Sequence, residues 1–351
     1  MRTFTFKGLF LTAVFMLLGC LTIQAADDNL ITKQITVKLD KAGTLPNKIG
    51  SSKKYLITNL KIIGEINGTD WEMIREMAGR NYGGNTTEGK LSVLDLSEAK
   101  IVEGGDYYYH DNYYEYYTSN DKIGKYAFYG CSGLTSLNLP AGITEIGEGA
   151  FYQCSGLTSL NLPDGITSIG DNAFEGCSGL TSLNLPAGIT RISDYAFYGC
   201  SGLTSINLPA SITEIGGSAF QGCSGLTNIT LPSSITKIGY NAFYGCSGLT
   251  SIYVYAEKVP EIDSNVFEEC DAKKCTVYVP KGTYDDYWLS DFGYFENIVE
   301  FDATGIDKTT TSTDAKEVSR YSVNGQRLVG PTKGLNIVKY SDGSVKKVAV
   351  E

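Results

Sequence analysis

Nine cysteines are the residues of this chain whose type and spacing could most readily do chemistry. A metal site needs thiolates that converge on one point, commonly as C-x-x-C pairs. Most of these cysteines instead recur singly, at a fixed interval of 23 residues and without a local partner. We therefore interpret them as a buried row of small apolar side chains and expect neither a metal nor a cofactor. The row consists of Cys131, Cys154, Cys177, Cys200, Cys223 and Cys246.

Three further cysteines lie outside this row. Cys270 and Cys275 are close together near the end of the repeated stretch, so a disulfide between them and two separate thiols both fit the sequence. Cys20 ends a Leu-Leu-Gly-Cys segment that looks like a bacterial lipobox, which would place a lipid on Cys20.

The first 25 residues have the form of a signal peptide. Arg2 and Lys7 precede an apolar run from residue 8 to 19 that is shorter than the roughly 20 residues needed to span a bilayer. Cleavage before Ala26 would release the chain, whereas processing at the lipobox would anchor it through Cys20. Both routes export the protein, so we expect it at the cell surface, on the outer membrane, or secreted.

Motifs for catalysis are sparse. His110 is the only histidine, and the sequence points to no nucleophile or acid beside it. There is no nucleophile elbow, phosphate-binding loop or zinc-protease motif. Glu145 and Glu148 form a carboxylate pair whose counterparts change from unit to unit, as on a solvated edge. We expect no catalytic residues and no enzymatic activity, and a glycan-acting enzyme is the least favoured alternative.

The overall charge excludes one class of partner. The chain of 351 residues has a formal net charge of −10, whereas proteins that bind nucleic acid are usually basic. Its hydrophobic fraction of 42% is that of a folded protein. We therefore expect a folded, acidic protein that does not bind nucleic acid.

The elements that must position these residues follow from the 23-residue repeat between residues 123 and 254. Each L-x-x-L-x-L-P segment predicts a strand: Leu137 and Leu139 point inward, Ser136 and Asn138 point outward, and Pro140 ends the strand. The isoleucines that follow predict a second inward row, and the A-F-x-x-C segment predicts a helical turn facing the core. Stacked units would place identical residues about 4.8 Å apart.

These motifs resemble a known family. The pattern L-x-x-L-x-L-P followed by I-x-x-I-G-x-x-A-F-x-x-C is similar to the BspA-like leucine-rich repeats of bacterial surface proteins, over residues 123–280 and more loosely from residue 57. The resemblance implies a leucine-rich-repeat solenoid: a right-handed α/β-type superhelix with a parallel sheet on its concave face and an irregular or short-helical convex side. It also implies an adhesin-like protein that binds extracellular proteins. No binding residues are standard across the family.

The chain divides into five expected segments. Residues 1–25 are the signal peptide, 26–122 are capping coils with a tyrosine-rich insertion, and 123–302 are the repeats with a C-terminal cap. Residues 303–317 are a linker rich in Thr, Ser and Asp. Residues 318–351 form a small β unit with hairpin turns at Asn324-Gly325 and Asp342-Gly343. That unit looks like the C-terminal sorting or anchoring modules of Bacteroidetes proteins.

Two sets of residues are candidates for binding. A polar row on the outward side of the strands either solvates the sheet or offers a platform to an extended ligand; it contains Asn138, Asn161, Asn184, Asn207 and Tyr253. The tyrosines of the insertion either pack on the cap or make contacts, and tyrosine suits contacts because it offers a large area with few rotatable bonds. They are Tyr107, Tyr108, Tyr109, Tyr113, Tyr114, Tyr116 and Tyr117.

The sequence thus predicts a non-enzymatic protein that displays a binding surface to an extracellular or host protein. The alternative from another class is a carbohydrate-binding module of a gut- or host-associated bacterium, with a glycan as the partner. Contact with a membrane is expected only through a lipid on Cys20 or through C-terminal sorting.

Overall fold

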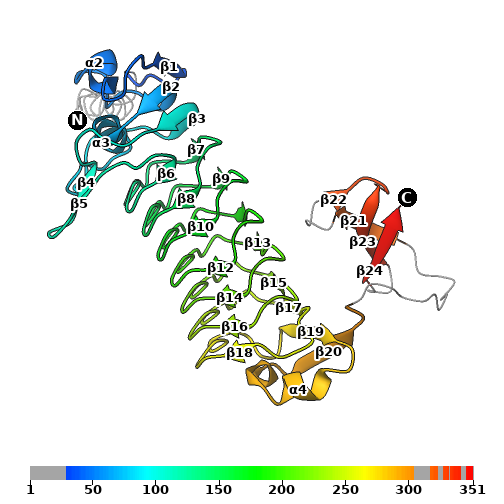
Figure 1. The fold of residues 1–351 in the computed structure, drawn as a ribbon. Helices are drawn as coiled ribbons and strands as arrows, with labels where there is room; N and C mark the ends of the chain where they lie inside the picture. The colour runs from blue at the N-terminus through cyan, green and yellow to red at the C-terminus, as the bar shows by residue number, and fades with distance from the viewer. Residues whose placement is uncertain (1–28, 304–316, 323–326, 332, 341–344, 351) are drawn as a thin grey trace, which may run out of the picture.

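The computed structural model describes residues 29–303, 317–322, 327–331, 333–340 and 345–350. Residues 29–303 form one elongated stack of coils that runs from an N-terminal cap to a C-terminal cap (Figure 1). The signal peptide, Cys20, most of the linker and both hairpin turns of the β unit lie outside the described residues. Within the described residues, no helix is both long and apolar enough to cross a membrane.

One ladder of parallel strands runs along the stack as three consecutive sheets (Figure 1). Equivalent residues of successive coils are partners, so Leu137 lies beside Leu94 on one side and Leu160 on the other. The strands are β1 (Ile35–Lys38), β2 (Asn59–Ile66), β3 (Val93–Ile101), β7 (Ser136–Asn138), β9 (Ser159–Asn161), β11 (Ser182–Asn184), β13 (Ser205–Asn207), β15 (Asn228–Leu231), β17 (Ser251–Val254), β19 (Thr276–Pro280) and β20 (Asn297–Phe301).

The predicted second inward row is also a parallel ladder. Its strands are two residues long and end at an isoleucine that is fully buried in most coils, such as Ile146 and Ile215. They are β6 (Lys122–Ile123), β8 (Glu145–Ile146), β10 (Ser168–Ile169), β12 (Arg191–Ile192), β14 (Glu214–Ile215), β16 (Lys237–Ile238) and β18 (Glu261–Ile262).

The A-F-x-x-C segments form turns instead of the predicted helical turn. Each coil has two residues at positive φ, for example Tyr195 (57°) and Gly199 (67°), and this conformation ends any helix. The N–H groups of the segment donate to the next coil, as from Phe197 N to Ala219 O at 2.8 Å. The convex side of the repeats is therefore irregular and carries no helix.

Stacked phenylalanines occupy the centre of the core. Each is buried, and consecutive rings are nearly parallel with centroids 5.2 to 5.9 Å apart. Such offset stacking adds to the stabilisation from burial itself. The ladder consists of Phe128, Phe151, Phe174, Phe197, Phe220, Phe243 and Phe267.

The cysteine row is buried as predicted, but its thiols also donate hydrogen bonds. Cys177 Sγ donates to the carbonyl of Phe151 in the preceding coil at 3.1 Å, and the other coils repeat this contact at 3.0 to 3.2 Å. The disulfide considered between Cys270 and Cys275 is not formed, because Cys270 continues this row and both thiols are free and buried.

Side chains of the N-terminal cap replace the coil that would precede the first repeat. In the second coil, Ala150 O accepts a hydrogen bond from the N–H of Phe128. The equivalent Ala127 O has no coil before it and accepts instead from Trp71 Nε1 at 3.0 Å and from the Arg75 guanidinium at 2.9 Å. Both donors lie on α3 (Gly68–Met77), which packs beside α2 (Leu45–Ile49).

The C-terminal cap closes the other end of the core. Tyr287, Phe292 and Phe295 are fully buried against Phe267, on the elements α4 (Tyr284–Trp288) and η1 (Asp291–Tyr294). Beyond the linker, four antiparallel strands pair in the order β22-β21-β23-β24. These strands are β21 (Glu317–Ser322), β22 (Arg327–Leu328), β23 (Gly334–Tyr340) and β24 (Val345–Val350).

Candidate interaction surfaces

The tyrosine-rich insertion folds into a small hairpin of β4 (Tyr109–His110) and β5 (Glu115–Tyr116). Its inner tyrosines, defined as Tyr108, Tyr109 and Tyr116, pack on the cap. Tyr108 is 1% exposed and its hydroxyl donates to Lys125 O at 2.8 Å, while the Tyr109 ring lies 4.8 Å from the Arg75 guanidinium. These three therefore serve the fold, which corrects their assignment as binding residues.

The outer tyrosines, defined as Tyr113, Tyr114 and Tyr117, project into solvent. Their exposed fractions are 86%, 68% and 49%. Tyr117 also meets the half-buried Tyr107 edge to face, and Tyr107 in turn contacts Tyr82. The result is an exposed aromatic surface on a hairpin whose base is held by the inner tyrosines.

Asp111 organises the turn between the two strands of the hairpin. Its Oδ1 accepts the backbone N–H groups of Tyr113 and Tyr114 at 2.8 and 2.7 Å, and these bonds lower the pKa of Asp111. Its Oδ2 accepts the hydroxyl of Tyr116 at 2.9 Å; burial and this bond together raise the pKa of Tyr116 to about 12. The outer tyrosines are therefore presented from a turn with a defined backbone.

The predicted polar row lies on the exposed side of the strands. Asn138, Asn161, Asn184 and Asn207 are exposed, and Asn207 Nδ2 donates to Asn184 Oδ1 at 3.3 Å. Behind them a threonine in each coil donates its hydroxyl to the carbonyl of the preceding coil, at 2.9 to 3.4 Å. The side chains of this face thus bond along the stack, which accounts for their uniformity without a ligand.

The sheet face ends in an aromatic cluster that the sequence analysis did not assemble. Tyr253 stacks on Tyr278 with centroids 4.5 Å apart, and Phe301 meets both Tyr253 and Tyr255 edge to face. These residues come from β17, β19 and β20 and the segment after β17. Because Tyr253 and Tyr278 cover each other's faces, they expose ring edges rather than a flat surface for a sugar. The aromatic residues at equivalent strand positions were the available signal.

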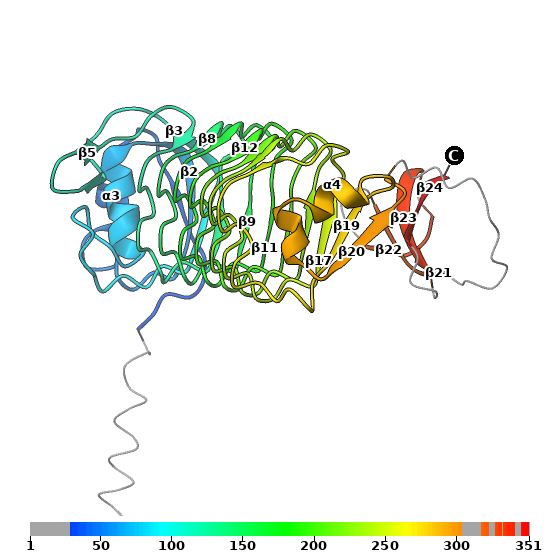
Figure 2. The same cartoon turned by 90° about the horizontal axis from the view of Figure 1, so that it is seen from below.

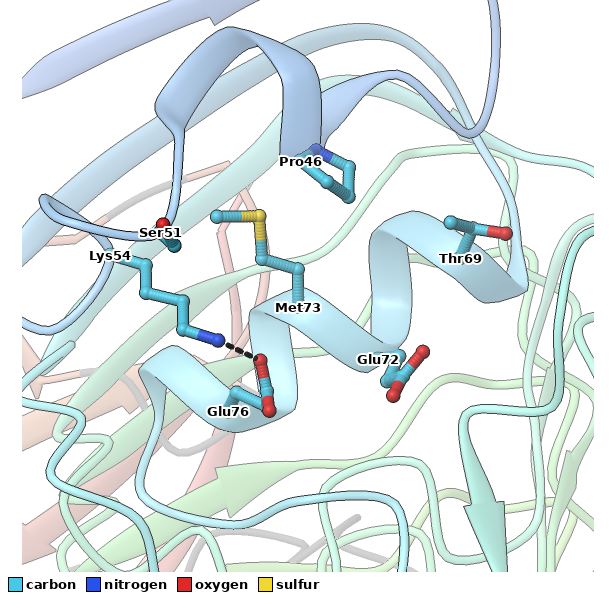
Figure 3. Close-up of a pocket in the computed structure, with 7 residues that line it drawn as sticks. All are labelled: Pro46, Ser51, Lys54, Thr69, Glu72, Met73 and Glu76. Carbon is cyan, nitrogen blue, oxygen red and sulfur yellow. Dashed lines mark hydrogen bonds and ion pairs between the residues drawn. The ribbon is translucent and has the colours of Figure 1, made fainter.

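A shallow pocket of about 230 Å³ lies beside α3 (Figure 3). Its acids are Glu72 and Glu76, and Lys54 pairs with Glu76 at 2.5 Å. Burial, with the nearby charges of Glu76 and Asp106, raises the pKa of Glu72. A glycosidase needs two carboxylates that flank one bond, and here one of the two is neutralised by a lysine. Within the described residues, no group of three or more His, Cys, Asp or Glu side chains is arranged to hold a metal ion.

The repeat pattern matches the model of the BspA type leucine rich repeat region in six copies, over residues 112–224 and 167–291. The chain belongs to this family. The BspA-type leucine-rich repeats are the coils described above, and the predicted family and solenoid fold are confirmed. No curated protein matches the sequence.

Solved leucine-rich repeat proteins of bacteria are similar in structure. A protein from Bacteroides ovatus is 21% identical with a TM-score of 0.39, covering 79% of this chain and 74% of that one. A Treponema pallidum (T. pallidum) protein is 25% identical with a TM-score of 0.32, covering 48% of this chain and 65% of that one. A leucine rich cell surface protein from Faecalibacterium prausnitzii is 24% identical with a TM-score of 0.35, covering 56% of this chain and 63% of that one. The match thus spans less than two thirds of the last two proteins.

The candidate residues of this BspA-type chain fall on two separate surfaces. The outer tyrosines stand on a hairpin that packs against α3 and the first coil, whereas the asparagines project from the strands. The surfaces also differ chemically, since one is aromatic and irregular and the other is polar and repetitive. Membership of the family supports an interaction protein at the cell surface and names no partner.

Proposed function

We propose that this protein is a non-enzymatic, exported scaffold that binds an extracellular or host protein through its outer tyrosines. The observation that carries the proposal is the contrast within the hairpin: its base is buried and hydrogen-bonded, while Tyr113 and Tyr114 are left 86% and 68% exposed. A rigid base that presents exposed aromatic side chains reduces the entropy lost on binding.

The test is binding of the mature chain to purified extracellular-matrix and plasma proteins, with and without the triple substitution Tyr113→Ser, Tyr114→Ser and Tyr117→Ser. Interface tyrosines commonly contribute more than about 1 kcal/mol each, so we expect affinity to fall at least tenfold. Tyr240→Ser is the matched control, because Tyr240 is also an exposed tyrosine but lies on the repeats. Unchanged affinity in the triple variant would refute the proposal.

Carbohydrate binding is the alternative that one observation favours, since the rings of the outer tyrosines are exposed enough to stack on sugars. A glycan array probed with the same variants separates the two. Signal from a defined glycan that disappears in the triple variant, together with no binding to the protein panel, would replace the proposed partner class with a glycan. The pocket beside α3, with Glu76 paired to Lys54, gives no comparable support to a glycan-acting enzyme.

A further inference from the structure

The two ends of the stack carry opposite charge. The basic end, residues 29–54, contains six lysines and one acidic residue, and five of these lysines are exposed. The acidic end, residues 284–302, contains six exposed acidic residues and no lysine or arginine. A charge separation of this size between the ends of a rod orients its encounters with other charged surfaces.

Both ends also expose the edge of a parallel sheet. β1 is the first strand of the ladder and β20 is the last, and each pairs with a neighbour on one side only among the described residues. An unpaired strand edge is a template for another strand. β20 of one molecule placed beside β1 of another would continue the parallel ladder in the same direction, as each coil does within the stack (Figure 1).

The acidic end is more apolar than an end exposed to water needs to be. Leu289 is 85% exposed and Trp288 and Val299 are each 46% exposed. Trp288 also stacks on Tyr284, so the two rings form one surface (Figure 2 shows α4 beside β20 at this end). The cap of a solenoid normally turns a polar face to solvent.

We propose that the acidic end binds the basic end of a second copy of this chain, so that molecules associate head to tail. Lysine on an edge strand ordinarily blocks pairing. Here the sign is reversed at the other end, so like ends repel and only opposite ends attract. The contact joins different surfaces of the two copies, and such a contact builds rows unless its rotation closes a ring.

Sedimentation velocity of the full mature chain tests this. We expect the mean mass to rise with protein concentration at low salt and to return to the monomer at high salt, because salt screens exposed charges. The triple substitution Lys33→Glu, Lys38→Glu and Lys41→Glu, and separately the double substitution Asp286→Lys and Glu296→Lys, should each give monomers. Mixing the two variants should restore association, because each then offers the charge that the other has lost.

The control is the double substitution Glu103→Lys and Asp164→Lys, which changes net charge as much as the acidic-end variant but lies on neither end and should leave association intact. Monomers at every concentration, or a mixture that stays monomeric, would overturn the proposal. So would a salt-dependent compaction that does not depend on concentration, since that would indicate that the chain's own C-terminal β unit covers the acidic end. The outer tyrosines are unchanged in all of these variants, so the result is independent of the proposed binding function.

Discussion

In the repeats, a carbonyl of each coil accepts an N–H from the coil before it, whereas in the first coil the equivalent carbonyl accepts from side chains of the cap. Ala150 O takes the N–H of Phe128, while Ala127 O takes Trp71 and Arg75. The repeats therefore share their stabilisation over many identical contacts, and the cap concentrates it in a few unique residues. We expect substitutions in the two regions to differ accordingly.

Alkaline pH should affect the repeats most strongly of all. Burial raises the pKa of the six thiols of the cysteine row, that of Cys200 to about 12. The folded protein thus keeps protons that the unfolded chain releases above pH about 8.5. This contribution to stability is complete below that pH and is lost as the pH rises, by about 1.4 kcal/mol per pH unit for each thiol.

Chemical denaturation at several pH values above 8 measures this slope, with pH about 7 as the reference. A variant with Cys200→Ala should show a shallower slope by the share of one thiol. A free energy of unfolding that stays constant through the alkaline range would mean that the thiols are accessible.

Phe197→Ala should have the largest effect of any single substitution in the repeats. Phe197 is fully buried between Phe174 and Phe220, and the cavity left behind should cost about 3–5 kcal/mol. The measurement is the free energy of unfolding from denaturant titration. A loss below about 1 kcal/mol would contradict a tightly packed ladder.

Arg75→Met should destabilise the cap by about 2–3 kcal/mol, because it removes a buried charged donor from Tyr126 O and Ala127 O. The matched control is Arg191→Met on the repeats, where the arginine is partly exposed and forms surface ion pairs with Asp194 and Glu214. That control should cost less than about 1 kcal/mol. Equal losses in the two variants would remove the distinction between cap and repeats.

Tyr108→Phe should cost about 1–2 kcal/mol, because Lys125 O loses the hydroxyl that bonds to it in a buried site. Tyr117→Phe, in the same hairpin but exposed, should stay within about 0.5 kcal/mol of the wild type. Thermal unfolding of the pair compares them directly, and identical midpoints would show that Tyr108 does not support the first coil.

The same contrast explains what the sequence could reveal. The coils, the inward Leu, Ile and Phe rows and the outward asparagines were predictable because identical residues recur at a constant period. A period does not tell whether a buried cysteine only packs or also donates a hydrogen bond, so the bond from Cys177 to Phe151 O was missed. It also does not exclude a helical turn, because the residues at positive φ vary from Tyr195 to Ser218 and give no uniform signal.

The insertion has no period at all, and its prediction failed for that reason. Tyr108 and Tyr113 are the same residue type, five positions apart, and only the tertiary contact with Lys125 separates a buried support from an exposed side chain. Likewise nothing near Trp71 in sequence indicates that its indole will bond to Ala127, 56 residues away. Contacts made once, over long separations, leave no pattern to read.

The smallest effect should come from the double substitution Tyr113→Ser and Tyr114→Ser. Both side chains are exposed, and the bonds that hold their turn run from their backbone N–H groups to Asp111, so serine preserves them. We expect the free energy of unfolding to change by less than about 0.5 kcal/mol. A loss comparable to that of Tyr108→Phe would place the outer tyrosines in the cap. If stability is instead unchanged, the hairpin carries two large aromatic side chains that the fold does not need.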